Sequence, residues 1–330
     1  MKKYILKRVL IAIATVLVLT TVIFFLVHLL PGDPFSSEKT NEAIKAKMMA
    51  YYGLDKPLFE QWFTYMKNML HGDFGVSLKY VGRSVNSAIA QTFPYSAGLG
   101  IRALLLALTC GLVLGTLAAQ SAGRILDYVC VLIAIIGVSM PDFIIGTLLQ
   151  LLFAIKLNWL PAGQWLGFSY YILPVFALSL YTLSLITRLM RSSMLDVLHQ
   201  DYILTAEAKG LSRFEIIWRH EIRNAILPIV TTMGPLTAAV LTGTFVLERI
   251  FAIPGMGKFY VQSINDLDYT MVLGMTTFYG IFLVTANLIV DILYGVIDPR
   301  IKLAGESGKT KKIKQIKSTG TEMLTETTEG

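Results

Sequence analysis

The sequence predicts an all-α, polytopic membrane protein with six transmembrane helices. The 330-residue chain is 54% hydrophobic and only 15% charged, whereas soluble domains carry about 25% charged residues. Its apolar residues gather in runs of membrane length, because about 20 helical residues cross a hydrocarbon core of about 30 Å. Six such runs predict the spans, at residues 9–30, 103–123, 128–155, 169–187, 224–247 and 269–290.

The basic residues predict the orientation of these spans. Lys2, Lys3, Lys7 and Arg8 precede the first apolar run. That run is too long for a cleaved signal peptide and no small-residue cleavage site follows it, so we expect a retained helix. The positive-inside rule places its basic flank in the cytoplasm, and six spans then place both termini there. The net charge of +7 is therefore explained by topology, without nucleic-acid binding.

The chain divides into four parts, which the pattern of runs and composition defines. An amphipathic helix is expected at residues 57–70, where apolar residues recur at spacings of three and four. It could cover its own protein, lie on the membrane or contact an external partner. The four parts are a first transmembrane helix (1–30), an extracytoplasmic segment (31–95), a core with five spans and a cytoplasmic loop at 191–228 (96–303), and a disordered cytoplasmic tail (304–330).

The cytoplasmic loop contains the most informative local pattern. Ala206, Ala208 and Gly210 form a cluster of small residues, and Gly210 suits the position that ends a helix. Ser212 and Glu215 then form a capping box that starts a second short helix. A helix, a glycine turn and a helix beside the membrane predict an element that docks against a partner protein.

Several other chemistries are disfavoured by the sequence. The stretch from Gly305 to Thr310 resembles a phosphate-binding loop, but the required first glycine falls on Leu303. Any ATP energy must therefore come from another chain. No nucleophile, acid–base or metal-ligand constellation is readable, so we expect neither an enzyme nor a metal site, and we interpret Cys110 and Cys130 as packing residues.

Asp142 is the one carboxylate well inside a predicted span, and it follows Pro141. It could line a pathway, cap the helix that restarts after the proline, or lie nearer the interface. We place Met140, Asp142 and Phe143 near the substrate route, because a proline break opens backbone groups there. Arg188 and other charges near span ends are explained by snorkelling.

Taken together, separated motifs resemble the inner-membrane permease subunits of ATP-binding-cassette importers for dipeptides and oligopeptides, most closely the first subunit of the oligopeptide pair. The resemblance extends to about Leu303. The motifs are LPGDP at 30–34, YGLDKP at 52–57, GDFGVS at 72–77, SMPDF at 139–143, TAEAKGL at 205–211, RH at 219–220, RNA at 223–225, FAIPGMG at 251–257 and DPRI at 298–301.

The resemblance implies a type I importer permease fold in the bacterial inner membrane and a function in peptide uptake. It implies a homologous second permease, two ATPase subunits that bind ATP and magnesium, an extracytoplasmic peptide-binding protein and surrounding membrane lipid, with no cofactor on this chain. The family's glutamate at the start of the loop motif is replaced by Leu204. The coupling residues that the resemblance assigns are Leu204, Thr205, Ala206, Ala208, Gly210, Leu211 and His220.

Two alternatives stay open at this point. Related permeases carry nickel complexes, glutathione or antimicrobial peptides. A membrane signalling or scaffold subunit could also have kept the same fold.

Overall fold

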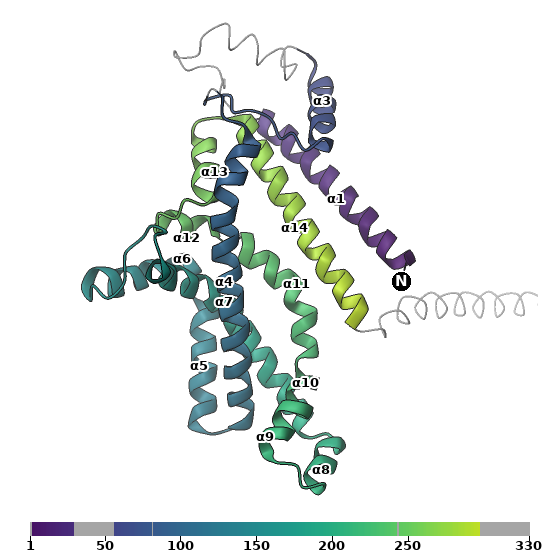
Figure 1. Ribbon diagram of the computed structural model, residues 1–330, viewed down its shortest axis with the longest axis vertical. Helices are drawn as coiled ribbons and strands as arrows, with labels where there is room; N and C mark the ends of the chain where they lie inside the picture. Colours follow the sequence, from purple (N-terminus) through teal and green to yellow (C-terminus); the bar gives the residue numbers. More distant parts are fainter. Residues whose placement is uncertain (1, 30–55, 81, 243, 298–330) are drawn as a thin grey trace, which may run out of the picture.

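The computed structural model describes residues 2–29, 56–80, 82–242 and 244–297 (Figure 1). Our expectations for the outer segment before residue 56 and for the tail after residue 303 lie outside these residues. Within them the chain is helical, and strand pairing is limited to one isolated bridge between Val76 and Ser84. The helices that form the body are α1 (Lys2–His28), α4 (Val85–Gln120), α5 (Ile125–Ser139), α6 (Asp142–Leu149), α7 (Phe168–Leu198), α11 (Leu227–Thr242), α12 (Thr244–Ile250), α13 (Met256–Asn265) and α14 (Tyr269–Ile297).

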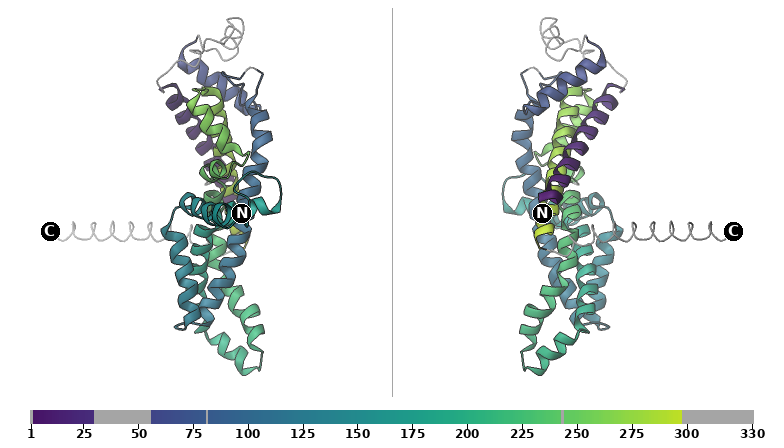
Figure 2. Two further views of the ribbon diagram at one scale, coloured as in Figure 1. Left: turned by 90° about the vertical axis from the view of Figure 1, so that its left-hand side faces the viewer. Right: turned by 90° about the vertical axis from the view of Figure 1, so that its right-hand side faces the viewer.

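Helices α4 and α7 form the spine of the molecule and pack together along most of their lengths (Figures 1 and 2). Small residues on α4 allow this close approach, as they do in many membrane helix pairs. A Cβ atom placed on Gly115 would lie 2.7 Å from the carbonyl oxygen of Thr187, so any larger residue would push the two helices apart. The small-residue stripe on α4 is buried and comprises Gly100, Ala103, Ala107, Gly111, Gly115 and Ala118.

Four described helices are long and apolar enough to cross a membrane, namely α1, α4, α7 and α14. This confirms four of the six predicted positions, although α4 and α7 extend well beyond the uncharged runs. The expected fifth position, 224–247, is occupied mainly by α11, which has only 16 residues, and by the start of α12. Six spans are therefore reached only if α11 and the bent segment described next each count as one.

The span expected at 128–155 is broken at the proline near its middle. Helix α5 ends at Ser139, and α6 with the π-helical segment η1 (Gln150–Lys156) leaves at an angle of 107°. Met140 is extended at this corner, and Pro141 cannot donate the backbone hydrogen bond that would continue α5. The segment is therefore a pair of helices bent at the proline.

The predicted amphipathic helix is confirmed as α3 (Leu58–Leu70), which lies on its own protein. The indole of Trp62 donates a hydrogen bond to Thr21 of α1 at 3.1 Å, and the Tyr65 hydroxyl donates one to Thr277 of α14 at 3.3 Å. Burial raises the pKa of Tyr65 to about 12. The buried face of α3 is therefore explained by the first of the three expectations, that this helix covers its own protein.

The start of α1 and the end of α14 lie on the same side of the molecule. These helices run side by side, and the Arg8 guanidinium forms an ion pair with Asp291 at 2.7 Å (Figure 1).

At the lower end of the molecule in Figure 1 lies the tip, which consists of α8 (Asp201–Ala208), α9 (Arg213–Ile216), the π-helical segment η2 (Ile217–Glu221) and α10 (Ile222–Ala225).

Candidate functional site

The turn that ends α8 has the geometry that the sequence predicts. Gly210 has a φ of +75°, a conformation that suits glycine. Its N–H donates to the carbonyl of Glu207 at 2.9 Å, and the N–H of Leu211 donates to the carbonyl of Ala206 at 3.3 Å. These two bonds form a Schellman motif, which satisfies the last carbonyls of the helix.

The predicted capping box at Ser212 is also confirmed. The N–H of Glu215 donates to Ser212 Oγ at 3.4 Å, and the N–H of Ser212 donates to Glu215 Oε2 at 3.3 Å. The hydrogen bonds from Ser212 lower the pKa of Glu215. The turn and the cap together fix the direction in which the second helix leaves the first.

The second helix of the tip contains a π-helical turn and exposes two aromatic side chains. Segments α9, η2 and α10 continue one another, and the buried residues Ile216 and Glu221 are five positions apart. This spacing belongs to a π turn rather than to an α turn. Phe214 and Trp218, four positions apart, point outward and are 74% and 64% exposed. We missed both residues, although a Phe and a Trp four apart beside basic residues were a readable signal.

The predicted coupling residues divide between the interior and the surface of the tip. Ala206 is buried, and Leu211 and His220 are half-buried. Leu204, Thr205, Ala208 and Gly210 are exposed. Apart from Gly210 and its two neighbours, none of the residues that the structure describes comes within 4 Å of a Cβ atom placed on Gly210, so the space beside it is open.

A buried polar network attaches the tip to the end of α4. The Glu221 side chain is fully buried and lies 3.4 Å from an Arg213 guanidinium nitrogen. Gln120 of α4 donates a hydrogen bond to Glu221 and accepts one from Arg213 at 2.5 Å. Burial raises the pKa of Glu221, and the charge of Arg213 and the bond from Gln120 oppose that rise. Movement of α9 and η2 is therefore tied to α4.

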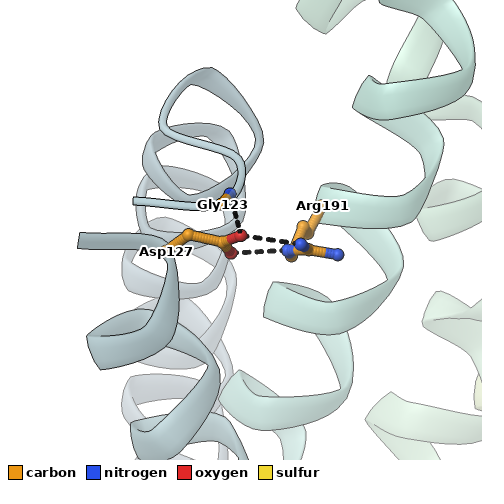
Figure 3. A network of polar contacts seen from close by, with 3 residues as sticks. All are labelled: Gly123, Asp127 and Arg191. Atoms are coloured by element: carbon orange, nitrogen blue, oxygen red, sulfur yellow. Dashed lines mark hydrogen bonds and ion pairs between the residues drawn. The ribbon is translucent and has the colours of Figure 1, made fainter. Parts of the chain in front are cut away.

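A second polar contact joins the turn after α4 to α7 (Figure 3). The guanidinium of Arg191 donates two hydrogen bonds to the Asp127 carboxylate, and the backbone N–H of Gly123 donates a third at 3.0 Å. The Asp127 side chain is only 4% exposed. This contact fixes the start of α5 to the end of α7.

The corner between α5 and α6 borders a cavity of about 360 Å³. Of the three residues expected near the substrate route, Met140 and Asp142 line this cavity, whereas Phe143 does not belong to its lining. Asp142 Oδ1 accepts a hydrogen bond from the N–H of Phe143 at 2.8 Å, so it also serves the first turn of α6. Other residues that complete the wall, among them Tyr181 and Thr182 of α7 and Val240 of α11, were not expected from the sequence.

Among the described residues, no three His, Cys, Asp or Glu side chains are grouped closely enough to hold a metal ion. Cys130 is buried and Cys110 is half-buried, and both thiols are free. The candidate site consists of the tip and the cavity at the corner between α5 and α6.

Comparisons with known proteins agree along almost the whole chain. Residues 111–303 match the family described as "Binding-protein-dependent transport system inner membrane component", and residues 1–98 match its N-terminal family. The dipeptide transport system permease protein DppB of Bacillus subtilis is 47% identical over 304 residues, which are 92% of this chain and 99% of that protein. The oligopeptide transport system permease protein OppB of Escherichia coli K12 is 43% identical over 92% of this chain and 100% of its own length. A crystal structure described as an amino acid ABC transporter with histidines is 14% identical, with a TM-score of 0.49, over 63% of this chain and 92% of that one.

Proposed function

The chain belongs to the family of binding-protein-dependent transport system inner membrane components, and on that basis we propose that it is the permease subunit of an ATP-driven importer of short peptides. The observation that carries the substrate is full-length similarity to permeases named for dipeptides and oligopeptides, at 39–47% identity. As a multi-pass permease component, the chain is not itself an enzyme. ATP and magnesium are bound by partner ATPases.

The tip is the ATPase-docking element in this proposal. Phe214 and Trp218 offer two exposed aromatic side chains, and aromatic residues of this kind often dominate protein interfaces. Leu204, which is 61% exposed, adds a third apolar contact. The open space beside Gly210 allows a partner's backbone to approach closely.

The ion pair between Arg8 and Asp291 supports the proposed topology. It requires the start of α1 and the end of α14 to lie on the same side of the membrane. Because the basic N-terminal flank favours the cytoplasm, both ends are assigned to that side. The extracytoplasmic binding protein then meets the side that carries α3.

The assignment is tested by a pull-down of the tagged chain in mild detergent from its native host, with mass spectrometry of the captured proteins. We expect a second permease and two ATPases that carry phosphate-binding loops. The same complex, reconstituted with its binding protein, is then expected to take up a labelled tripeptide only when ATP is present. Recovery of this chain alone from well-solubilised membranes, or ATP-independent uptake, contradicts the proposal.

A further inference from the structure

Two cavities follow the same pair of helices, α7 and α11. The outer one is the cavity beside Asp142, to which α7 contributes Tyr181 and α11 contributes Val240. The inner one has a volume of about 610 Å³ and includes Arg188 of α7 and Leu236 of α11. Each step inward along α7 is matched by a step back along α11, so the cavities form successive parts of one route.

Each cavity contains one charged side chain without a protein counter-ion. In the part of the chain that the structure describes, Arg188 makes no ion pair, and Asp142 accepts only its neighbour's amide hydrogen bond. The inner lining contains no carboxylate and the outer lining contains no cation. Charged side chains in a membrane span are costly and are kept mainly where they serve a pathway or a partner. Snorkelling explains Arg188 less well, because α7 continues for ten residues beyond it.

The spacing of the two cavities along α7 fits a short peptide. Tyr181, beside the outer cavity, and Arg188 are seven helical residues apart, which corresponds to about 10 Å along α7. An extended chain advances about 3.3–3.6 Å per residue, so about three residues cover that distance. The remaining inner lining is mostly apolar and includes Leu185, Leu189 and Pro235, with Ser192 and Thr232 as neutral polar groups.

We propose that peptides travel along the α7–α11 route with the terminal carboxylate bound by Arg188 and the terminal ammonium bound by Asp142. This inference rests on the proposed function. Every free peptide has these two termini whatever its side chains, so a route that binds the termini accepts many sequences. Because Arg188 lies on the side of the tip, the peptide enters the cytoplasm carboxylate first.

The test uses the complete importer in proteoliposomes, with ATP inside and binding protein outside. Uptake of labelled trialanine is compared with uptake of its C-terminal amide, each at a concentration that saturates the binding protein. In Arg188→Gln, uptake of the free acid falls by about tenfold or more, the effect expected from losing a charge-assisted hydrogen bond, and uptake of the amide stays at its wild-type value. Arg188→Lys retains most of the preference for the acid. The control is Arg124→Gln, which removes a cation that lines neither cavity.

The outcomes separate three readings. If the wild-type importer takes up neither peptide, the proposed function itself fails. If Arg188→Gln lowers uptake of acid and amide equally, Arg188 serves the second permease or a lipid head group, and the inference is overturned. An unchanged ratio with unchanged uptake overturns it as well.

Photocrosslinking gives an independent measurement of orientation in the same assembled importer. A tripeptide with a benzophenone group on its C-terminal residue is expected to label residues 185–192 or 232–236. A tripeptide with the group on its N-terminal residue is expected to label residues 138–142, 181–182 or 240. A reversed pattern, or identical labelling by both peptides, rules out the proposed orientation.

Discussion

The guanidinium of Arg191 binds both oxygens of the Asp127 carboxylate, with Nε at 2.6 Å from Oδ1 and the second nitrogen at 2.7 Å from Oδ2. This bidentate contact ties the beginning of α5 to α7 (Figure 3). Planar guanidinium and carboxylate groups match each other in a way that a lysine ammonium cannot reproduce.

Removing either partner of this ion pair is expected to lower the stability of the folded protein. Asp127→Ala leaves the Arg191 guanidinium without its partner, and Arg191→Met leaves a carboxylate that is 4% exposed, so each should lower the free energy of unfolding by about 3 kcal/mol or more. The double variant Asp127→Ala/Arg191→Met removes both charges and should recover most of that loss. Denaturation in detergent measures all three, and strictly additive losses would contradict a coupled pair.

Gly210 is expected to be needed both for the backbone conformation of the turn and for the close approach of a partner. Gly210→Ala places a Cβ atom in the left-handed region and should cost about 1–2 kcal/mol, whereas Gly210→Trp should also abolish ATP-driven uptake by blocking the docking surface. Gly72 is a matched control, because it ends α3 with φ of +78°, similar hydrogen bonds and equally open space. Gly72→Trp should therefore retain coupling between ATP hydrolysis and uptake. Normal ATP-driven uptake by Gly210→Trp would contradict a docking role for Gly210.

The exposed aromatic residues of the tip should matter for assembly and little for folding. Phe214→Ala and Trp218→Ala are expected to change stability by less than about 0.5 kcal/mol, because both side chains are largely exposed. Each should reduce co-purification of the ATPase by about fivefold or more if it is an interface anchor. Phe59→Ala on α3 removes an aromatic side chain that is 69% exposed and provides the comparison. Equal recovery of ATPase with all three variants would argue against the assigned surface.

Glu221 predicts a pH dependence for the attachment of the tip. Its folded-state pKa is raised by burial, so its contribution is fully present below the unfolded value of about 4.5 and is lost as the pH rises through the folded value. Hydrogen exchange of residues 213–225, corrected for intrinsic rates, should therefore show weaker protection at about pH 7 than at about pH 5. Glu221→Gln should flatten this dependence, and Glu60→Gln on α3, at the other end of the molecule, should leave it unchanged. A dependence that persists in Glu221→Gln would assign it to another group.

Glu221→Ala is expected to behave differently from the glutamine variant. It leaves the amide of Gln120 and the guanidinium of Arg213 without their buried acceptor, which costs about 1–3 kcal/mol. The same exchange experiment should show faster opening of α9 and η2 at every pH. If the two substitutions have equal effects, the buried acceptor does not hold the tip to α4.

The features that depend on neighbouring residues were readable from the sequence. The turn at Gly210 and the cap at Ser212 need only groups a few positions away, and the structure reproduces both. The position of the break at Pro141 was likewise readable, because proline removes a backbone donor wherever it occurs. Four of the long spans followed from hydrophobic length alone.

The features that depend on packing between distant segments were not readable. The 107° bend after Ser139 brings α6 against α12, where a Cβ atom on Gly146 would meet Leu247, and no local pattern encodes that contact. The π turn that places the buried Ile216 and Glu221 five residues apart was not readable either, because ordinary helical periodicity does not encode it. The charge-free runs also underestimated α7, because charged residues continue the helix beyond the apolar segment.

Because of the bend, the helices that face the membrane differ in length around the protein. Helix α5 has 15 residues and a length of about 22 Å, whereas α1 has 27 residues and a length of about 40 Å. A hydrocarbon core of about 30 Å matches a tilted α1 but exceeds α5 by several ångström. On the α5 flank, lipid must therefore thin locally or give way to another protein surface, so this hydrophobic mismatch favours assembly there over exposure to the bilayer.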